Sequence, residues 1–509
     1  MKLNYKRTIY VGLAFFLIML FWQTYDAIIP KILTDKFGMP HFWSGIIMAF
    51  DNILALFMLP LFGAISDKHK GKRGRRTPFI MIGTILAAIA LVGLSFVDAA
   101  QLKKLDDIAG VTDSDSAIYE QAMENLYDSD PEISVGTKKA PLSSFISREE
   151  FVSLDDESQE YFEYVTPARQ AYAARVTSEN WVILAVFIAV LLFALISMST
   201  FRSPAVALMP DVTPKPLRSK ANAVINLMGS IGGILILLLG AVFGTGSAKN
   251  TLMSYLPVFS VTAALMLVAL IVFRFKVNEP MFVADMEKQT GCDVNDGEQG
   301  AEGERKLSRA ERRSLLFILA SVVLWFMGYN AVTSKYSVYA TEVLGLDFNT
   351  TLMLASAAAI VTYIPVGMLA SRIGRKKSIM IGVTLLATAL TLAMFLRQGC
   401  SIWIVNILFS MAGIGWATIN VNSYPMVVEM SRGSNVGKYT GYYYTASMAA
   451  QTVTPVFSGV LFDIWGIENV FFPYAAIFVA LALITMFFVK HGDSRPVSQK
   501  PSIEAFDVD

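Results

Sequence analysis

Twelve long apolar segments are the feature that most constrains the fold of this 509-residue chain. A helix needs roughly 20 apolar residues to cross the hydrocarbon core of a bilayer, where only helices and closed barrels satisfy their own backbone hydrogen bonds. Charged residues make up only 16% of the chain, whereas a soluble protein carries about a quarter. The sequence therefore predicts an all-α membrane protein with twelve spans, at 8–30, 42–64, 77–98, 180–208, 219–244, 252–275, 314–338, 350–371, 378–397, 401–428, 437–461 and 468–489.

Lys and Arg collect on one side of the membrane if these twelve helices alternate in direction. The loop 68–76 holds six of them, residues 305–313 hold five, and the loop 372–377 holds four. Short loops rich in Lys and Arg mark the cytoplasmic side. We therefore expect a multi-pass protein of the cell inner (plasma) membrane with both termini in the cytoplasm.

Two polar stretches interrupt the apolar pattern. Residues 100–178 carry sixteen Asp/Glu against seven Lys/Arg, and we expect an acidic, solvated cap outside the cell, in which runs such as 151–160 could form polar helices. The second stretch joins two six-helix units, and its centre is rich in Gly, Asp and Glu. The expected domains are an N-terminal bundle at 1–275, a cytoplasmic linker at 276–313, a C-terminal bundle at 314–490 and a cytoplasmic tail at 491–509.

The two units share a repeated pattern. A small residue and a basic loop, Gly63 with Arg75 and Arg76, recur 304 residues later as Gly367 with Arg375. From Gly63 to Asp211 there are 148 residues, and from Gly367 to Glu429 there are 62, a difference of 86. The 79 residues of 100–178 account for most of that difference. The sequence thus predicts two parallel repeats related by an axis along the membrane normal.

Two ionisable residues lie deep in the predicted spans. Asp51 is about nine residues into the second span, or roughly 13 Å at 1.5 Å per residue, and a carboxylate there could exchange a proton or bind a small cation. Arg202 lies at a similar depth from the other side, too far in for easy snorkelling. We expect Asp51 and Arg202 to couple cation binding to transport, the alternative being a permanent buried contact.

Polar and aromatic residues near the centre are candidates for substrate binding. Trp22 and Asp26 lie together on the first span, where a carboxylate and an aromatic face suit a sugar, although both could belong to the interfacial belt. Lys335 on the seventh span is a candidate that could also reach the outer interface. The remaining candidates are amides that could instead serve ordinary helix packing, namely Asn330, Asn420, Asn422 and Gln451.

A third set of residues lies at the predicted cytoplasmic rim. Ion pairs there can hold one conformation and break in another, so we expect a role in gating. The alternative is that positive residues gather there for topology alone. The set comprises Gly63, Asp67, Arg75, Arg76, Asp211, Gly367, Arg375 and Glu429.

The residues that surround these motifs resemble a known family. The repeated basic loop resembles the signature loop of the major facilitator superfamily. Residues 59–68 and 74–80 are similar to the glycoside–pentoside–hexuronide cation symporters and to sucrose transporters. Residues 202–222, 339–345 and 439–444 resemble the same branch. The resemblance implies a twelve-helix fold in two six-helix bundles and cation-coupled sugar transport.

The chain departs from that branch at three positions. Sucrose transporters of plants carry an acid three helical turns before the Arg of the fourth helix, where this chain has Leu191 in an apolar run. Melibiose-type symporters place a cation-binding Asp directly before the proline of the second helix, where this chain has Leu59. Relatives often carry a Glu where Thr333 stands here. Asp51 is therefore the residue that we expect to retain coupling.

The sequence favours a secondary transporter that moves a sugar or glycoside, such as a disaccharide, inward with a proton or a sodium ion. An exporter or carrier of another small metabolite, anionic ones included, is the first alternative, with Arg202 and Lys335 as counter-charges. A non-transporting membrane sensor that uses residues 100–178 as its receptor surface is the second. No P-loop pattern or His/Cys cluster occurs, so we expect no enzyme activity, nucleotide, nucleic acid, metal or other cofactor.

Overall fold

The computed structural model describes residues 3–69, 71–108, 115–135, 138–156, 158–213, 218–247, 250–290, 308–430 and 436–491. This part of the chain is almost wholly helical. Each of the twelve predicted spans overlaps one long helix, although some predicted ends lie up to four residues outside it, as at 252–255 and 394–397. These helices are α1 (Tyr5–Lys31), α2 (His41–Lys68), α3 (Thr77–Leu102), α7 (Trp181–Val212), α8 (Arg218–Phe243), α9 (Leu256–Lys276), α11 (Arg309–Glu342), α12 (Phe348–Ile373), α13 (Arg375–Ala393), α14 (Ile402–Glu429), α15 (Val436–Trp465) and α16 (Ile467–Phe487).

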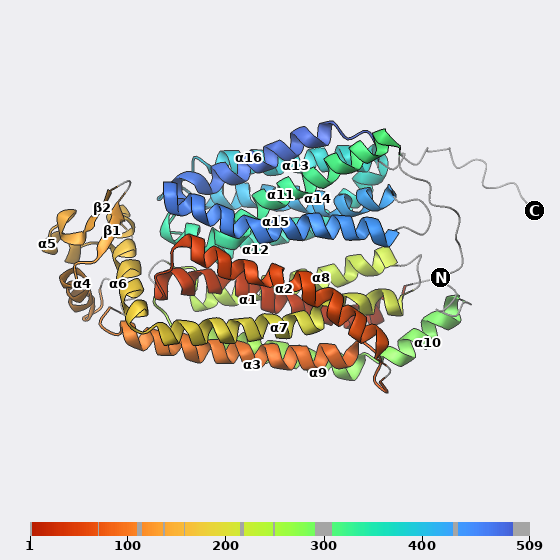
Figure 1. Cartoon of the computed structure of the whole chain (residues 1–509), viewed down its shortest axis with the longest axis horizontal. Helices are drawn as coiled ribbons and strands as arrows, with labels where there is room; N and C mark the ends of the chain where they lie inside the picture. The colour runs from red at the N-terminus through yellow and green to blue at the C-terminus, as the bar shows by residue number, and fades with distance from the viewer. Residues whose placement is uncertain are drawn as a thin grey trace, which may run out of the picture.

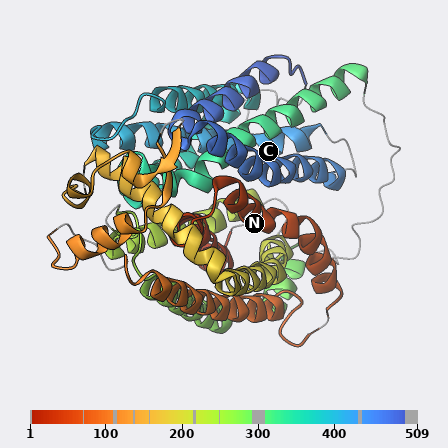
Figure 2. The same cartoon turned by 60° about the vertical axis from the view of Figure 1, so that its left-hand side comes forward.

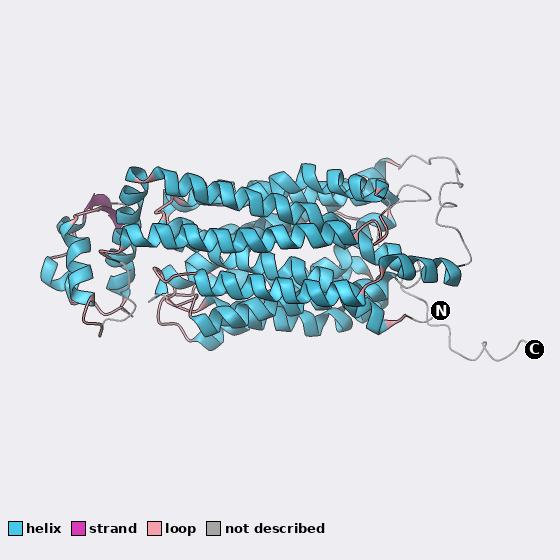
Figure 3. Ribbon diagram, turned by 90° about the horizontal axis from the view of Figure 1, so that it is seen from below, coloured by secondary structure: helices cyan, strands magenta, loops and turns pink. Residues whose placement is uncertain are grey.

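The long helices form two groups that lie side by side (Figure 1). The first half consists of α1, α2, α3, α7, α8 and α9, and the second half consists of α11 to α16. The halves meet chiefly where α15 packs on α2 and α12 packs on α8. All twelve helices run along roughly one direction (Figure 3). Within the described residues, ten helices are long and apolar enough to cross a membrane, and α12 holds a shorter apolar stretch, Phe348–Tyr363.

The bundle has two distinguishable ends. The insert end carries the described part of residues 103–180, and the basic end carries the turn between α2 and α3 and the N-terminus (Figure 1). Local sequence signals fix several boundaries at these ends. The Asn4 side chain accepts a hydrogen bond from the backbone N–H of Arg7 and starts α1. Gly374 and Gly466 adopt φ of +93° and +80°, which favours glycine, and allow α13 and α16 to start directly after the preceding helix.

The first span is longer than its hydropathy predicts. We expected it to end near residue 30, but the helix continues through a π-helical turn, η1 (Ile32–Lys36). The sequence hides this extension because Pro30, Thr34, Asp35 and Lys36 resemble a polar loop. The side chains of η1 are nevertheless all buried.

The insert is a small folded unit rather than a solvated cap alone. It contains η2 (Lys103–Leu105), α4 (Tyr119–Asp128), the antiparallel strands β1 (Glu132–Val135) and β2 (Lys138–Pro141), η3 (Leu142–Ser144), α5 (Arg148–Val152), the π-helical turn η4 (Tyr161–Val165) and α6 (Thr166–Glu179). Figure 2 brings this segment forward. Its acidic surface surrounds a separate hydrophobic core that includes Leu126, Phe151, Val165 and Leu252, the last from beyond α8. The run 151–160 is helical only at its ends.

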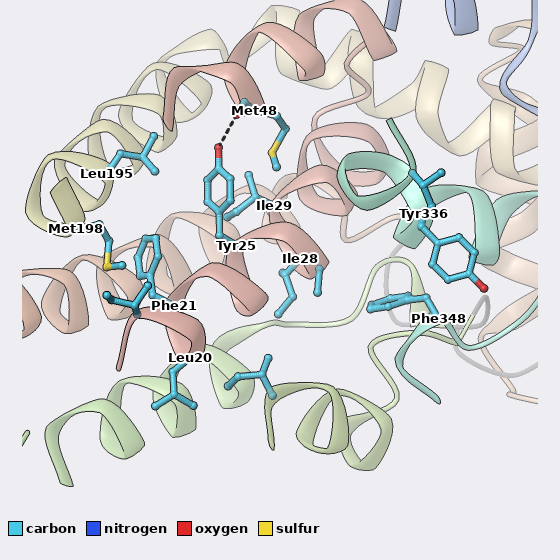
Figure 4. Close-up of a cluster of buried hydrophobic side chains, with 14 of the residues drawn as sticks. Leu20, Phe21, Tyr25, Ile28, Ile29, Met48, Leu195, Met198, Tyr336 and Phe348 are labelled. Carbon is cyan, nitrogen blue, oxygen red and sulfur yellow. Dashed lines mark hydrogen bonds between the residues drawn. The ribbon is translucent and has the colours of Figure 1, made fainter. Parts of the chain in front are cut away.

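Tight packing holds α1 against its neighbours near the middle of the first half. Phe21 and Tyr25 of α1 are almost fully buried, and they lie with Met48 of α2 and Met198 of α7 in one apolar cluster (Figure 4). The Tyr25 hydroxyl donates a hydrogen bond to the Met48 carbonyl oxygen at 3.4 Å. This packing fixes the rotation of α1, and with it the direction of Trp22 and Asp26.

Candidate functional site

Three ionisable side chains from different helices converge near the middle of the first half. Asp51 lies ten residues into α2, Asp26 lies ten residues before the end of η1, and Arg202 lies ten residues before the end of α7, so each is about 15 Å from a helix end. Side chains tilt toward the N-terminus of their helix. Because α1 and α7 run in opposite directions, Asp26 and Arg202 tilt toward each other. All three side chains are partly accessible despite this depth.

The cluster is held by polar and aromatic contacts. The Arg202 guanidinium stands over the Trp22 ring, 5.2 Å from its centre, and interacts electrostatically with both Asp26 and Asp51. The Asn52 amide donates a hydrogen bond to Asp51 Oδ1 at 2.7 Å. Within the described part of the chain, no direct ion pair joins Arg202 to either carboxylate. The arrangement leaves charged atoms available to a bound ion or solute.

Aromatic residues of the second half face this cluster. Tyr329 of α11 interacts electrostatically with Asp26, and Tyr444 of α15 does so with Arg202. The Tyr329 ring stacks on Trp416 of α14, with ring centres 3.6 Å apart and planes at 3°. Charged side chains of the first half therefore face aromatic side chains of the second half. Sequence analysis missed Trp416, whose only signal was an aromatic residue in an apolar run.

Two of the predicted substrate residues carry polar atoms without a partner. Trp22 Nε1 and Asn330 Nδ2 are both buried, and neither has a hydrogen-bond acceptor among the described residues. An unsatisfied buried N–H costs roughly 1–3 kcal/mol. Trp22 lies on α1 and Asn330 on α11, the first helix of each half. Oxygen atoms of a bound solute would satisfy both donors.

Three other predicted substrate residues are not brought to this cluster by any described contact. The Asn422 amide donates to the Thr418 carbonyl oxygen of its own helix at 2.9 Å, and the Gln451 amide donates to Ser447 at 3.3 Å. Asn420 is exposed in the middle of α14. The Asn422 and Gln451 bonds are ordinary intrahelical contacts of polar residues in apolar helices.

Lys335 lies nearer the insert end, between the halves. Its side chain is fully buried, and Nζ donates a hydrogen bond to Ser44 Oγ of α2 at 2.7 Å. The alternative, that Lys335 reaches the outer interface, does not hold, because α11 continues seven residues further to Glu342. The lysine instead ties α11 to α2.

Further hydrogen bonds join the two halves at the same end. They come from side chains that sequence analysis did not single out, because nothing in the local pattern pairs residues so far apart in the chain. Helices α2 and α15 also approach each other closely at this end, because a Cβ on Gly45 of α2 would lie 2.2 Å from the Pro455 carbonyl oxygen of α15. The bonds are Lys31 Nζ to Thr341 Oγ1 (3.0 Å), the backbone N–H of His41 and of Phe42 to the Asp463 carboxylate (2.8 and 2.7 Å), Asn349 Nδ2 to Thr245 Oγ1 (3.0 Å) and Gln170 Nε2 of the insert to Glu342 Oε1 (2.9 Å).

A buried ion pair lies within the first half. Lys36 Nζ contacts Asp98 Oδ1 at 2.6 Å and also donates to the Met253 carbonyl oxygen at 2.6 Å, and both charged side chains are fully buried. The other Asp98 oxygen accepts the Tyr255 backbone N–H at 3.1 Å. Such complete pairing is what a buried charge requires. This pair fixes η1 to α3 and to the start of α9.

The predicted gating residues of the first half do meet at the basic end. Asp211 accepts from Arg75 Nη2 at 2.9 Å and from Arg76 Nε at 2.8 Å. Arg76 Nη1 also donates to Ser66 Oγ at 2.5 Å and to the Gly63 carbonyl oxygen at 3.4 Å. The Asp211 carboxylate of α7 thus binds the start of α3 directly, and Arg76 links this pair to the end of α2.

Glu279 completes this end and was missed by sequence analysis. It opens the linker helix α10 (Glu279–Thr290) and is only 2% exposed. Its carboxylate accepts the backbone N–H of Arg75, Arg76 and Thr77 at 2.8–3.1 Å. Three free N–H groups at a helix start form a natural carboxylate site.

The second half is less fully described at this end. Arg375 Nη1 donates to the Pro425 carbonyl oxygen at 3.3 Å. The side-chain surroundings of Asp67, Gly367 and Glu429 lie outside the described residues. Among the described residues, no group of three His, Cys, Asp or Glu could hold a metal ion.

Two groups of membrane-length helices, with charged residues facing aromatic residues between them, define a polytopic membrane protein of the transporter class. The model of the major facilitator superfamily matches residues 171–364 and 351–506, and that of MFS/sugar transport proteins matches residues 10–100. The chain therefore belongs to the major facilitator superfamily. This confirms the predicted superfamily and its fold of twelve helices in two bundles, and it indicates a membrane transporter rather than an enzyme.

Two curated relatives match shorter parts of the chain. The sucrose transport protein SUC4 of Arabidopsis thaliana is 37% identical over 58 residues, which are 11% of either chain. The multidrug resistance protein MdtG of Proteus mirabilis is 27% identical over 165 residues, 32% of this chain. The chain thus spans only 11% and 39% of the length of these relatives.

Solved structures show the same fold along nearly the whole chain. The xylose transporter XylE of E. coli in an inward open conformation has a TM-score of 0.58 at 13% identity, covering 96% of both chains. A bacterial homologue of the iron transporter ferroportin in an inward-facing state has a TM-score of 0.60 at 11% identity, covering 96% of this chain and all of the other. The nucleoside transporter NupG has a TM-score of 0.53 at 11% identity, covering 95% of this chain and all of the other.

Proposed function

We propose that this protein is a secondary active transporter that takes up a sugar or glycoside, such as a disaccharide, with a proton or a sodium ion. The observation that carries the proposal is the placement of Asp26, Asp51, Arg202 and Trp22 opposite Tyr329 and Trp416. Sugar recognition combines hydrogen bonds from charged or amide groups with an apolar sugar face resting on an aromatic ring. The similarity to a sucrose transport protein over 58 residues supports the same substrate class.

The two helix groups are the moving units of this proposal. Residues 1–275 and 314–490 rock about the central cluster, with 276–313 as the linker and 491–509 as a tail. The basic end faces the cytoplasm, because its loops carry the Lys and Arg. Among the described residues, the hydrogen bonds that join the halves lie at the insert end. This supports a state that is closed toward the outside of an inner (plasma) membrane.

In the proposed mechanism Asp51 carries the coupled cation. An ionised Asp51 interacts with Arg202, whereas a protonated or cation-bound Asp51 releases Arg202 toward Trp22 and the substrate. Asp26, Trp22 and Asn330 contact the solute, and Trp22 Nε1 and Asn330 Nδ2 supply donors that are otherwise unpaired. Gly63, Arg75, Arg76 and Asp211, together with Gly367, Arg375, Asp67 and Glu429, form the cytoplasmic gate.

Uptake by vesicles tests the proposal. Labelled sucrose or maltose should accumulate when a proton or sodium gradient is imposed and should equilibrate without it. Asp51→Asn should abolish accumulation but retain equilibrium exchange of substrate. Asp106→Asn, which removes an exposed carboxylate at the base of the insert, is the matched control. Full gradient-driven accumulation by Asp51→Asn would remove this residue from coupling.

A carrier of an anionic metabolite is the second candidate. It is favoured by Arg202, which makes no direct ion pair within the described part of the chain. Uptake that is competed by organic anions but not by sugars would select this candidate. The same vesicles, loaded with each class of solute, distinguish the two.

A further inference from the structure

The first turn of α2, in the first half, is bound by a carboxylate of the second half. The backbone N–H groups of His41 and Phe42 donate to the two oxygens of Asp463 at 2.8 and 2.7 Å. Asp463 lies near the end of α15, two residues before Trp465. The N–H groups of a first helical turn have no partner within their own helix, and the helix dipole favours a negative charge beside them. Asp463 therefore acts as the N-terminal cap of α2.

Helix α2 has no cap in its own sequence. The residue before its first turn is Pro40, which makes no side-chain capping hydrogen bond and has no side-chain acceptor. Helices usually carry Ser, Thr, Asp or Asn at this position. Helix α12, the second long helix of the other half, follows that rule, because Asp347 accepts the backbone N–H of Asn349 at 3.0 Å. The second half thus supplies to α2 a cap that α12 has in its own sequence.

The face of α15 that carries Asp463 fits closely against α2. Pro455, Gly459 and Asp463 follow one another at intervals of four residues, so they lie along one face of α15. A Cβ on Gly459 would lie 2.6 Å from the His41 carbonyl oxygen, and one on Gly45 would lie 2.2 Å from the Pro455 carbonyl oxygen. The two helices cannot come closer at these points. The cap therefore forms where the contact between the halves is tightest.

We propose that Asp463 is the latch of the insert end: it caps α2 while the halves are closed there, and opening of this end leaves the first turn of α2 without a cap. The proposal rests on the alternating-access part of the proposed function, but on neither its substrate nor its coupled ion. Asp463 is exposed, so water replaces the two hydrogen bonds as soon as α15 moves away. Loss of an N-terminal cap shifts an equilibrium by roughly two- to thirtyfold. We expect the closed-to-open ratio of the insert end to depend on Asp463 by this factor.

A distance measurement on the full-length protein tests the latch without substrate or flux. Spin labels go on Lys104→Cys of the first half and Ser401→Cys of the second, both exposed at the insert end, with Cys292 and Cys400 replaced by Ser. The populations of short and long distances give the closed-to-open ratio. Asp463→Ala should lower this ratio roughly two- to thirtyfold. Asp463→Asn should lower it less, because an amide oxygen still accepts a backbone N–H.

Glu468→Gln is the matched control. Glu468 is a second exposed acid at the same end of the second half, and its Oε1 accepts from Asn469 of its own helix at 2.9 Å. This substitution removes a charge of the same sign without removing a contact to α2. The closed-to-open ratio should remain that of the unmodified protein.

Pro40→Ser separates the capping role from every other effect of the Asp463 charge. A serine at this exposed position can accept the backbone N–H of Phe42 or Trp43, so that α2 keeps a cap when the insert end opens. Pro40→Ser should therefore lower the closed-to-open ratio even though Asp463 is present. In the Pro40→Ser background, Asp463→Ala should have a smaller effect than it has alone.

Three results would overturn the proposal: an unchanged ratio in Asp463→Ala, an equal decrease in Glu468→Gln, or a full Asp463→Ala effect in the Pro40→Ser background. If Asp463→Ala does not fold, Pro40→Ser alone decides, and an unchanged ratio in that variant would overturn the proposal. The measurement is independent of the substrate. A carrier of an anionic metabolite would give the same distances, whereas a failure to take up sugar would contradict only the proposed substrate class.

Discussion

The Arg202 guanidinium lies over the Trp22 indole ring, 5.2 Å from the ring centre. This contact joins α7 to α1 across the charged cluster and orients Arg202 between Asp26 and Asp51. An arginine that lies over an aromatic face keeps the N–H donors in its guanidinium plane available to other groups. The relationship explains why a charge can sit this deep without a direct ion pair.

Replacing Trp22 should weaken substrate binding. Trp22→Leu removes a cation–π contact of about 0.5–2 kcal/mol, so the KM for uptake should rise roughly two- to thirtyfold. Trp22→Phe restores a ring but not the indole N–H, and an intermediate KM is expected. An unchanged KM in Trp22→Leu would place the solute elsewhere.

Breaking the buried pair in the first half should destabilise the protein strongly. Asp98→Asn leaves the Lys36 ammonium buried without its counter-charge, at a cost of about 3–5 kcal/mol. Thermal unfolding in detergent should show a lower Tm. The double variant Lys36→Met with Asp98→Leu should recover most of that loss, because an apolar pair has no uncompensated charge. Failure of the double variant to recover would point to lost hydrogen bonds instead.

Removing Glu279 should loosen the start of α3. Glu279→Ala leaves the backbone N–H groups of Arg75, Arg76 and Thr77 without an acceptor, each worth roughly 1–3 kcal/mol if still buried. Hydrogen exchange at these amides should accelerate, and Glu279→Gln should do so less. Glu287→Ala, about two turns further along α10, is the matched control. Equal exchange in all variants would contradict the capping role.

A methyl group on Gly45 should open the insert end. The added Cβ would lie 2.2 Å from the Pro455 carbonyl oxygen, so α2 and α15 must separate. A cysteine at Thr341, which is 1% exposed, should then react faster with an impermeant maleimide. Gly93→Ala, whose Cβ meets only the Val190 side chain of the same half at 3.3 Å, should not change the rate.

Most of the fold could be predicted from the sequence, because a chain that crosses a bilayer needs long apolar helices that hydropathy detects. Hydropathy alone located the twelve helices, and the repeated basic loops predicted the duplication. The alternative of an interfacial Asp26 arose because η1 resembles a polar loop in sequence, whereas its side chains are buried. The fold of the insert was hidden in a similar way, since acidic residues outnumber the apolar residues that form its core.

The sequence predicted site residues that are recognisable one at a time, and it missed residues whose role depends on a distant partner. Asp51, Arg202 and Trp22 stand out as polar or aromatic groups deep in apolar spans. Lys36 with Asp98, Lys31 with Thr341, and Glu279 with the start of α3 lie 62, 310 and about 200 residues apart, and no local pattern links them. Only the folded chain reveals such contacts.

The insert is attached at both ends to the first half, through α3 and α7, yet Gln170 and Phe162 reach the second half at Glu342 and Gly345. The insert therefore moves with the first half, whereas its contacts with Glu342 and Gly345 depend on the position of the second half. An antibody fragment raised against the seam between α6 and α11 would recognise a single conformer, and so would provide a handle for trapping the carrier in mid-cycle.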